Sequence, residues 1–438
     1  MITHIQMKNF KSWKDSGEVQ LAPFTGFFGT NSSGKSSLLQ MLLMLKQTIG
    51  SDEIISFGNE NSLVNLGYFH EVIHGHNVEE SLELGFGCKF PESITIVITQ
   101  DKPNPDGVTF DSFNFETTVK KYGNLQDVSR ICYDIGRGNQ KIKLEGNEIS
   151  YCGKRLFTGT YKNSYSIEET TQAFPDSNKP FNLLSSKFEE IFSHVFYLEP
   201  TRKHPQRYYH WEGDFPETPG QWGGSTIDAL LSARIDQRTT PYKGKNVPIE
   251  ERISAWLQKM ELAYAFEFAR TGPRDDKNYE FRIQKGPKSI KVTLADIGYG
   301  VAQFIPVLVL CYYVPIGSTL ILEEPGTHLH PKAQADIADL LIEVINERNL
   351  QILVESHSEH LLTRLQRRIA EKQIPEKNVA LYFCRNNDSA STIEKLDIDE
   401  ASGDIKNWPE NFFGDVMGDM FAMTDKQVES IAEKGTEG

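Results

Sequence analysis

This sequence of 438 residues has few cysteines. It lacks a long apolar run and an N-terminus of the kind that a secretory signal has. The longest apolar run, residues 304–316, contains two prolines and is shorter than the roughly 18 residues of a membrane span. Residues 1–5 lack the basic and apolar stretches of a secretory signal. The sequence therefore argues against a membrane or secreted protein.

The cysteines are odd in number, widely spaced and without a Cys-x-x-Cys pair, as in Cys88, Cys132, Cys152, Cys311 and Cys384. This spacing favours the reduced thiols of a cytoplasmic protein over a zinc site or a disulfide framework.

Basic residues are outnumbered, since 46 Lys and Arg stand against 60 Asp and Glu and give a net charge of −14. The balance argues against a protein whose whole surface coats nucleic acid, although a local basic groove stays open. Charge runs are usually solvated faces. The two clusters that could contact DNA are Arg202, Lys203 and Arg207, and Arg364, Arg367 and Arg368.

Both ends of the chain have an α/β pattern, in which apolar strands alternate with helices and predict a mostly parallel sheet. The middle has short alternating runs broken by Asn, Asp, Gly and Pro, typical of antiparallel sheet, and becomes helical near 249–266. The expected strands are 24–28, 318–322, 351–354 and 379–383, and the expected helices are 36–48, 301–314, 331–345 and 359–369.

The simplest architecture is one α/β domain interrupted by a large insertion. Residues 1–80 and 291–400 would form the domain, 81–290 the β-rich and then helical insertion, and 401–438 an appendage.

Residues 29–36 fit the pattern Gly-x-x-x-x-Gly-Lys-Ser/Thr of a phosphate-binding loop. A turn rich in Gly and Ser could match the same residue pattern. The apolar strand that precedes these residues and the buried helix that follows them favour a P-loop. Backbone N–H groups would hold phosphate oxygens, Lys35 would reach the β- and γ-phosphates, and the Ser36 hydroxyl would bind Mg²⁺. The predicted nucleotide-binding residues are Gly29, Thr30, Asn31, Ser32, Ser33, Gly34, Lys35, Ser36 and Ser37.

An apolar strand at 319–322 runs into Glu323 and Glu324. Buried carboxylates are costly unless they hold a cation or a proton, so Glu323 is predicted to bind Mg²⁺ and Glu324 to polarise the attacking water. His357 follows the next strand and can reach a γ-phosphate from the same sheet edge. His328 and His330 lack the spacing of a metal site, and a loop packed across a dimer interface is favoured.

A glycine-bearing turn, residues 294–303, opens the helix before the acidic strand. Such turns are common. A helix N-terminus other than the one after the phosphate loop can, however, bind the phosphates of a nucleotide held by another copy of the protein. The candidate residues are Asp296, Gly298 and Gly300.

The order of these motifs resembles the ABC-type ATPase heads of the SMC, RecF and OLD group. It is most similar to predicted AAA-family ATPases of bacterial phage-defence systems. The similarity rests on the sequence motifs at residues 9–12, 31–36, 300–303, 324–331 and 355–362 and in the tail at 407–413. It covers both ends of the chain, about half of its length. The fold that it implies is an α/β P-loop NTPase head.

The resemblance implies a head-to-tail dimer with two ATP molecules, each held by the P-loop of one copy and the signature turn of the other. Two positions depart from the family pattern. Asp296 and the residue before it stand where a signature serine is usual, so the contact would come from the backbone of Gly298 or Gly300. Glu323 replaces the more common Asp. Residues 66–70 are a candidate for the glutamine lid loop.

The sequence lacks the sustained heptads of long SMC arms, and little chain follows the last strands, which argues against a TOPRIM nuclease domain. The leading hypothesis is an ATPase switch that dimerises and controls DNA or a separate nuclease or toxin, in antiphage defence. The alternatives are a nucleotide-gated scaffold that sequesters a toxin with little turnover, and a RecF-like DNA repair ATPase. A transporter motor fits poorly.

Overall fold

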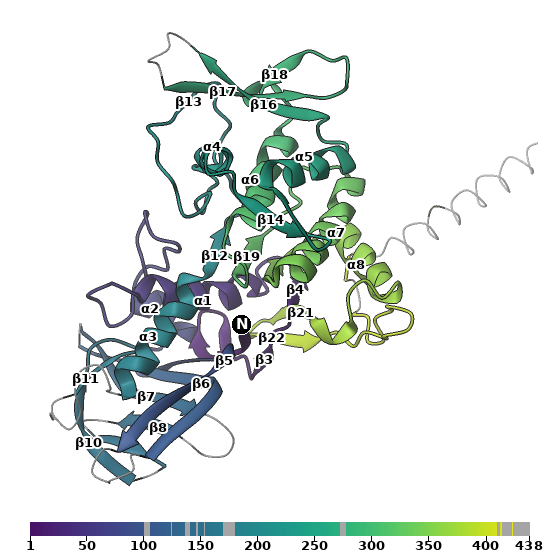
Figure 1. Ribbon diagram of the computed structural model, residues 1–438. Coiled ribbons are helices and arrows are strands. Elements are labelled where there is room, and N and C mark those ends of the chain that lie inside the picture. Colours follow the sequence, from purple (N-terminus) through teal and green to yellow (C-terminus); the bar gives the residue numbers. More distant parts are fainter. Residues whose placement is uncertain are drawn as a thin grey trace, which may run out of the picture.

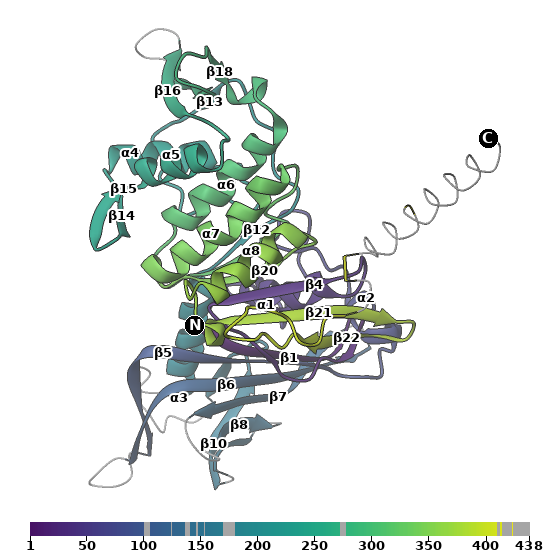
Figure 2. The same cartoon turned by 90° about the vertical axis from the view of Figure 1, so that its right-hand side faces the viewer.

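The computed structural model describes residues 1–99, 106–123, 125–135, 141–145, 148–152, 154–169, 180–271, 277–409, 412–413 and 423. A parallel sheet lies at the centre, with a bundle of helices on one face and a large antiparallel sheet beyond the other, as Figures 1 and 2 show from two sides. The phosphate loop and the acidic strand both belong to the central sheet.

The central sheet has the strand order β12-β19-β20-β4-β21-β22 among the described residues. Every neighbouring pair is parallel except β21 and β22, which form an antiparallel hairpin at the edge. The mostly parallel sheet expected from the sequence is therefore confirmed. The strands are β12 (Val195–Leu198), β19 (Thr319–Glu323), β20 (Gln351–Glu355), β4 (Phe24–Gly29), β21 (Val379–Asn387) and β22 (Ala390–Lys395).

The large antiparallel sheet joins the N-terminal strands to most of the middle of the chain. Its strand β5 pairs with β1, so this layer is continuous with the start of the chain. The described strands are β1 (Ile2–Phe10), β2 (Trp13–Asp15), β3 (Val19–Gln20), β5 (Leu82–Thr99), β6 (Asp106–Tyr122), β7 (Leu125–Ile135), β8 (Lys141–Glu145), β9 (Glu148–Tyr151), β10 (Lys154–Tyr161) and β11 (Ile167–Glu169).

The segment 81–290 does not stay outside the central sheet, because β12 returns to it and pairs with β19. The domain boundaries drawn from the sequence stay a prediction, but the segment is not one uninterrupted insertion in space.

Helices fill the remaining layers. The expected helices at 36–48, 301–314, 331–345 and 359–369 are confirmed to within a few residues as α1, α6, α7 and α8. The described helices are α1 (Lys35–Thr48), α2 (Phe69–Val72), α3 (Pro180–Ser193), α4 (Thr226–Ile235), α5 (Ile249–Lys259), α6 (Tyr299–Tyr313), α7 (Pro331–Arg348) and α8 (Glu359–Ala370). Within the described part of the chain, no helix is long and apolar enough to cross a membrane.

Two smaller sheets sit on the helical side (Figure 1). One contains β13 (Tyr209–His210), β16 (Ala265–Thr271), β17 (Asn278–Gln284) and β18 (Lys291–Thr293), and the other is the hairpin of β14 (Thr239–Tyr242) and β15 (Lys245–Pro248).

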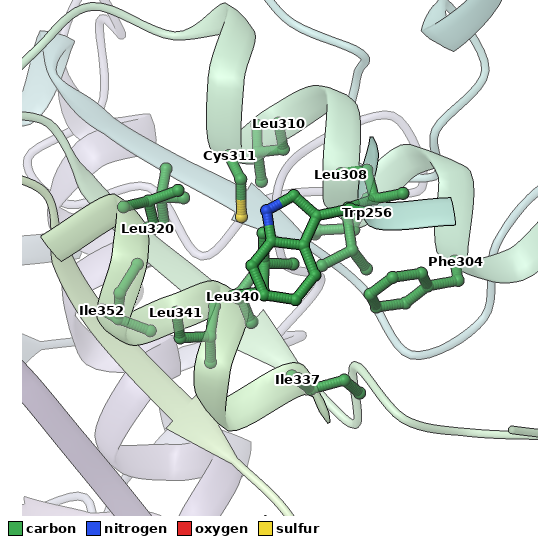
Figure 3. Close-up of a cluster of buried hydrophobic side chains, with 14 of the residues drawn as sticks. Trp256, Phe304, Leu308, Leu310, Cys311, Leu320, Ile337, Leu340, Leu341 and Ile352 are labelled. Carbon is green, nitrogen blue, oxygen red and sulfur yellow. The ribbon is translucent and has the colours of Figure 1, made fainter. Parts of the chain in front are cut away.

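Two hydrophobic cores lie on opposite faces of the central sheet, because successive side chains of a strand point to opposite sides. Leu320 and Leu322 join the helices of one core, whereas Ile321 between them joins the core shared with α1 and the antiparallel sheet. Figure 3 shows Trp256 of α5 among buried side chains of α6, α7 and the sheet. The sheet is thus fixed from both faces, and its strand ends are held in place.

The appendage expected at 401–438 is described only up to residue 409 and at 412–413 and 423. Phe412 and Phe413 stack on one another and meet the edge of Phe28, the last apolar residue before the phosphate loop. The remaining residues of this stretch lie outside the described chain.

Candidate functional site

The phosphate loop connects β4 to α1 and needs glycine at both ends. Gly29 has φ +139°, and a Cβ atom there would lie 2.1 Å from the carbonyl oxygen of Cys384. Gly34 has φ +88°, and its Cβ would lie 2.6 Å from Ser391 Oγ. The indole of Trp13 donates to the Gly34 carbonyl over 3.0 Å. The loop is therefore clamped between the β1–β2 turn and the β21–β22 hairpin, and only glycine fits there.

Helix α1 begins at Lys35 without a side-chain cap, so its first N–H groups stay available to an anion at the positive end of the helix dipole. The Lys35 ammonium donates to the carbonyls of Gly29 and Thr30 over 3.2 and 2.8 Å and is only 3% exposed. The Ser36 hydroxyl donates to Glu355 Oε1 over 3.0 Å. The loop thus presents a cation, a hydroxyl and free amides at one place.

Three carboxylates gather at the C-terminal ends of β19 and β20. Glu323 and Glu355 are register partners of these parallel strands, and Glu324 follows Glu323 directly. Tyr197 of β12 donates to Glu323 Oε1 over 2.9 Å. Burial, followed by the charge of Glu355, raises the pKa of both Glu323 and Glu324 to about 7. Burial also raises the pKa of Glu355.

Glu324 is held in a left-handed conformation with φ +44°. Its N–H donates to the Glu355 carbonyl over 2.9 Å, and Arg202 donates to the carbonyls of Glu323 and Glu324 over 3.2 and 3.5 Å. Among the described residues, no hydrogen-bond partner reaches Glu324 Oε1, which is buried. The backbone here is fixed while one carboxylate oxygen stays free for a ligand or a water molecule.

His357 lies beside this carboxylate, with Nε2 3.9 Å from Glu324 Oε1. Burial, followed by the charge of Lys35, lowers the pKa of His357, which favours the neutral imidazole near pH 7. The structure therefore brings together five residues that the sequence predicted from separate motifs: Lys35, Ser36, Glu323, Glu324 and His357.

In the part of the chain that the structure describes, no group of three or more His, Cys, Asp and Glu side chains is arranged to hold a metal ion by itself. The donor set nevertheless fits Mg²⁺, which prefers oxygen ligands and usually shares phosphate oxygens and water. Ser36 and Glu323 would hold the ion together with a bound nucleotide.

The signature turn contacts other elements than the phosphate loop. Arg207 donates two hydrogen bonds of 2.6 Å to the carboxylate of Asp296, which also accepts from Thr293. The ring of Tyr299 contacts His204 and His328. None of these described ring contacts and hydrogen bonds joins the turn to the phosphate loop of its own chain. Asp296, Gly298 and Gly300 stay predicted nucleotide contacts.

The two glycines of the turn differ in what surrounds them. A Cβ on Gly300 would lie 2.4 Å from the His328 carbonyl oxygen, whereas a Cβ on Gly298 would meet nothing within 4 Å. Gly300 therefore lets the start of α6 approach the loop that follows the acidic strand, and the backbone at Gly298 faces open space.

Replacing Gly300 with alanine is expected to lower the free energy of unfolding by about 1–3 kcal/mol, because backbone must move to accept the methyl group. The measurement is chemical denaturation. Gly298→Ala is the matched control and should cost less than about 1 kcal/mol as an N-cap change in open space. Equal losses in the two variants would contradict the packing role of Gly300.

Sequence reasoning missed three residues of this site: Glu355, Arg202 as a brace, and Tyr197. Glu355 ends the apolar strand β20 as Glu323 ends β19, and that shared pattern could have identified it. Arg202 was a candidate DNA contact, and this is wrong, since it is 2% exposed and donates to the backbone of the acidic strand.

The second basic cluster is also largely engaged within the molecule. Arg364 and Arg368 donate to Asp339, and the exposed Arg367 pairs with Glu371. His330 accepts a hydrogen bond from the Lys332 N–H as the N-cap of α7. The candidate lid at 66–70 has no glutamine and exposes Tyr68, and its role stays a prediction.

Family models match most of the chain in three pieces. Residues 1–204 match an "AAA ATPase domain", residues 228–363 an "AAA domain, putative AbiEii toxin, Type IV TA system", and residues 374–423 a "Protein of unknown function (DUF3696)". No curated protein matches the chain.

Solved structures similar to the chain include SMC head domains. The SMC head bound to the C-winged helix domain of ScpA is 12% identical, with a TM-score of 0.46 over 91% of this chain and 98% of that one. The SMC head of Thermotoga maritima is 12% identical, with a TM-score of 0.40 over 91% and 99%. The Pyrococcus furiosus SMC head with an extended coiled coil, bound to the C-terminal domain of ScpA, is 11% identical, with a TM-score of 0.44 over 90% and 96%.

The fold class is an α/β P-loop NTPase. A parallel sheet carries the phosphate loop after β4 and the acidic residues after β19, and both ATPase-domain models match around these motifs.

Proposed function

We propose that the protein is an ATP-hydrolysing switch whose two copies close head to tail around two Mg²⁺–ATP and thereby control a separate effector protein. The observation that carries the proposal is the convergence of Lys35, Ser36, Glu324 and His357 at one edge of the central sheet. These residue types at this edge are those that bind and cleave a triphosphate.

Each residue has a role that follows from its position. The free N–H groups of α1 and the Lys35 ammonium bind the phosphates. Ser36 and Glu323 hold Mg²⁺, which when bound neutralises charge on the phosphate oxygens. Glu324, with one oxygen free beside His357, accepts a proton from the attacking water, and His357 donates to the γ-phosphate.

The position of the signature turn supports a dimer. At this turn the backbone of Gly298 faces open space, and helix α6 begins without a side-chain cap. The described contacts of the turn are with Arg207, His204 and His328, and not with the phosphate loop of the same chain. A second copy could bring its nucleotide to this helix start, where free N–H groups bind anions.

An effector protein is favoured over DNA as the partner, because Arg202 is buried and Arg364 and Arg368 are paired with carboxylates. One matched family is described as "AAA domain, putative AbiEii toxin, Type IV TA system", and a toxin–antitoxin context is compatible with the proposed effector in antiphage defence. Co-purification of a nuclease or toxin that depends on a non-hydrolysable ATP analogue would identify the effector.

The switch is tested by light-scattering mass measurement of the full chain. A non-hydrolysable ATP analogue with Mg²⁺ is expected to double the mass of the 49.7 kDa chain, and ADP is expected to leave it monomeric. A mass that does not respond to nucleotide, together with ATP turnover independent of protein concentration, would refute the dimer.

A further inference from the structure

Glu355 occupies a central place in the site that the proposed roles do not use. Its Oε1 accepts the hydrogen bond of Ser36 and lies 4.0 Å from the Lys35 ammonium. Its other oxygen, Oε2, is buried and has no hydrogen-bond partner among the described residues. The residue as a whole is 8% exposed, so bulk water solvates it poorly.

Such an arrangement is unfavourable in the free protein. A buried carboxylate oxygen without a donor loses its hydration, and the strand register places the carboxylate of Glu323 beside that of Glu355, with Glu324 next in the chain. Lys35 cannot compensate all three carboxylates, because it carries a single positive charge, and its ammonium lies 4.0 Å from Glu355. The surplus of negative charge is what a divalent cation offsets.

We propose that Glu355 is a positioning residue for Mg²⁺: it orients the Ser36 hydroxyl and, with Glu323, supplies the negative charge that the ion of Mg²⁺–ATP neutralises. The inference rests on the proposed nucleotide site. It differs from the motif-based assignment, in which Glu323 is the single carboxylate on the metal side. The register of β19 and β20 places the two carboxylates side by side at the strand ends.

The geometry also separates this role from that of a structural brace. A brace needs only an acceptor for Ser36, which a glutamine side chain supplies with its amide oxygen. A role toward Mg²⁺ needs the charge. Glu355→Gln keeps the acceptor and removes the charge, and Glu355→Asp keeps the charge one methylene further from Ser36.

The experiment is calorimetric binding of a non-hydrolysable ATP analogue to the full chain, first in EDTA and then over a Mg²⁺ titration. Glu355→Gln is expected to raise the half-saturating Mg²⁺ concentration about 10- to 100-fold, as does loss of groups that orient metal ligands. Affinity in EDTA should be unchanged or higher, because a negative charge beside the phosphates is gone. Glu323→Gln should raise the Mg²⁺ requirement as well, and Glu400→Gln, at an exposed position, should not.

An unchanged Mg²⁺ requirement in Glu355→Gln, with Glu323→Gln impaired, would overturn the inference and leave Glu323 as the sole carboxylate. Equal losses in EDTA and in Mg²⁺ would assign Glu355 to bracing Ser36 and overturn it as well. Should Glu355→Gln fail to fold, Glu355→Asp decides: a requirement several-fold higher supports the role and an unchanged one overturns it. If the unmodified chain binds no nucleotide, the proposed function itself fails.

Discussion

Replacing Glu324 with glutamine is expected to lower steady-state ATP hydrolysis about 10²- to 10⁴-fold, the usual contribution of a general base. Glutamine keeps the size of the side chain but cannot accept a proton from water. The backbone contacts that fix residue 324, from Arg202 and to Glu355, involve main-chain atoms and are unaffected by the change. Binding of Mg²⁺–ATP should therefore stay within about threefold of the unmodified protein, and the ATP-bound dimer should accumulate.

The pH dependence gives an independent check on Glu324. Because its pKa is raised to about 7, the ionised base is lost as the pH falls through that value, and kcat/KM of the unmodified protein should fall with it. Glu400→Gln, an exposed change, serves as the control and should retain this profile. Normal turnover by Glu324→Gln, or a rate that does not vary between about pH 5.5 and about pH 8.5, would refute the assignment.

Replacing Lys35 with methionine is expected to weaken binding of Mg²⁺–ATP about 100-fold or more. Methionine retains an unbranched, apolar stem in this buried position but removes the ammonium. A hydrogen bond to a charged group contributes about 1.5–3 kcal/mol, and two such bonds to phosphate account for a loss of this size. Calorimetric titration with a non-hydrolysable ATP analogue measures the loss directly.

The matched control for Lys35→Met is Lys377→Met, which removes an exposed ammonium elsewhere on the chain and should bind as the unmodified protein does. Thermal unfolding of both variants without nucleotide shows whether the fold persists. If Lys35→Met binds with unchanged affinity, the phosphates do not lie in this loop.

The motifs that could be predicted from the sequence are those whose meaning is local. Gly29 and Gly34 are needed within one turn, and the strand that leads into Glu323 is continuous in the chain. Their meeting could be expected because parallel strands present their carboxyl ends at one edge of the sheet. The helices around them follow from apolar periodicity and were confirmed to within a few residues.

The rest depends on pairings between distant residues. Ser36 and Glu355 are 319 positions apart, and nothing in either neighbourhood encodes their hydrogen bond. Arg202 is buried because β12 pairs with β19, a pairing of segments more than 100 residues apart that composition could not indicate. Its charge alone suggested a solvent-exposed DNA contact, whereas its position makes it a brace of the acidic strand.

The segment after β12, residues 199–207, touches two functional regions within a few residues. Arg202 contacts the acidic strand from inside, and Arg207 and His204 contact the signature turn at the surface. In a head-to-tail dimer, the acidic strand would contact the nucleotide bound by its own copy, and the signature turn would contact the nucleotide bound by the partner copy. Since one short segment contacts both regions, binding of the two nucleotides would be cooperative. A plot of turnover against ATP concentration would then be sigmoidal rather than hyperbolic.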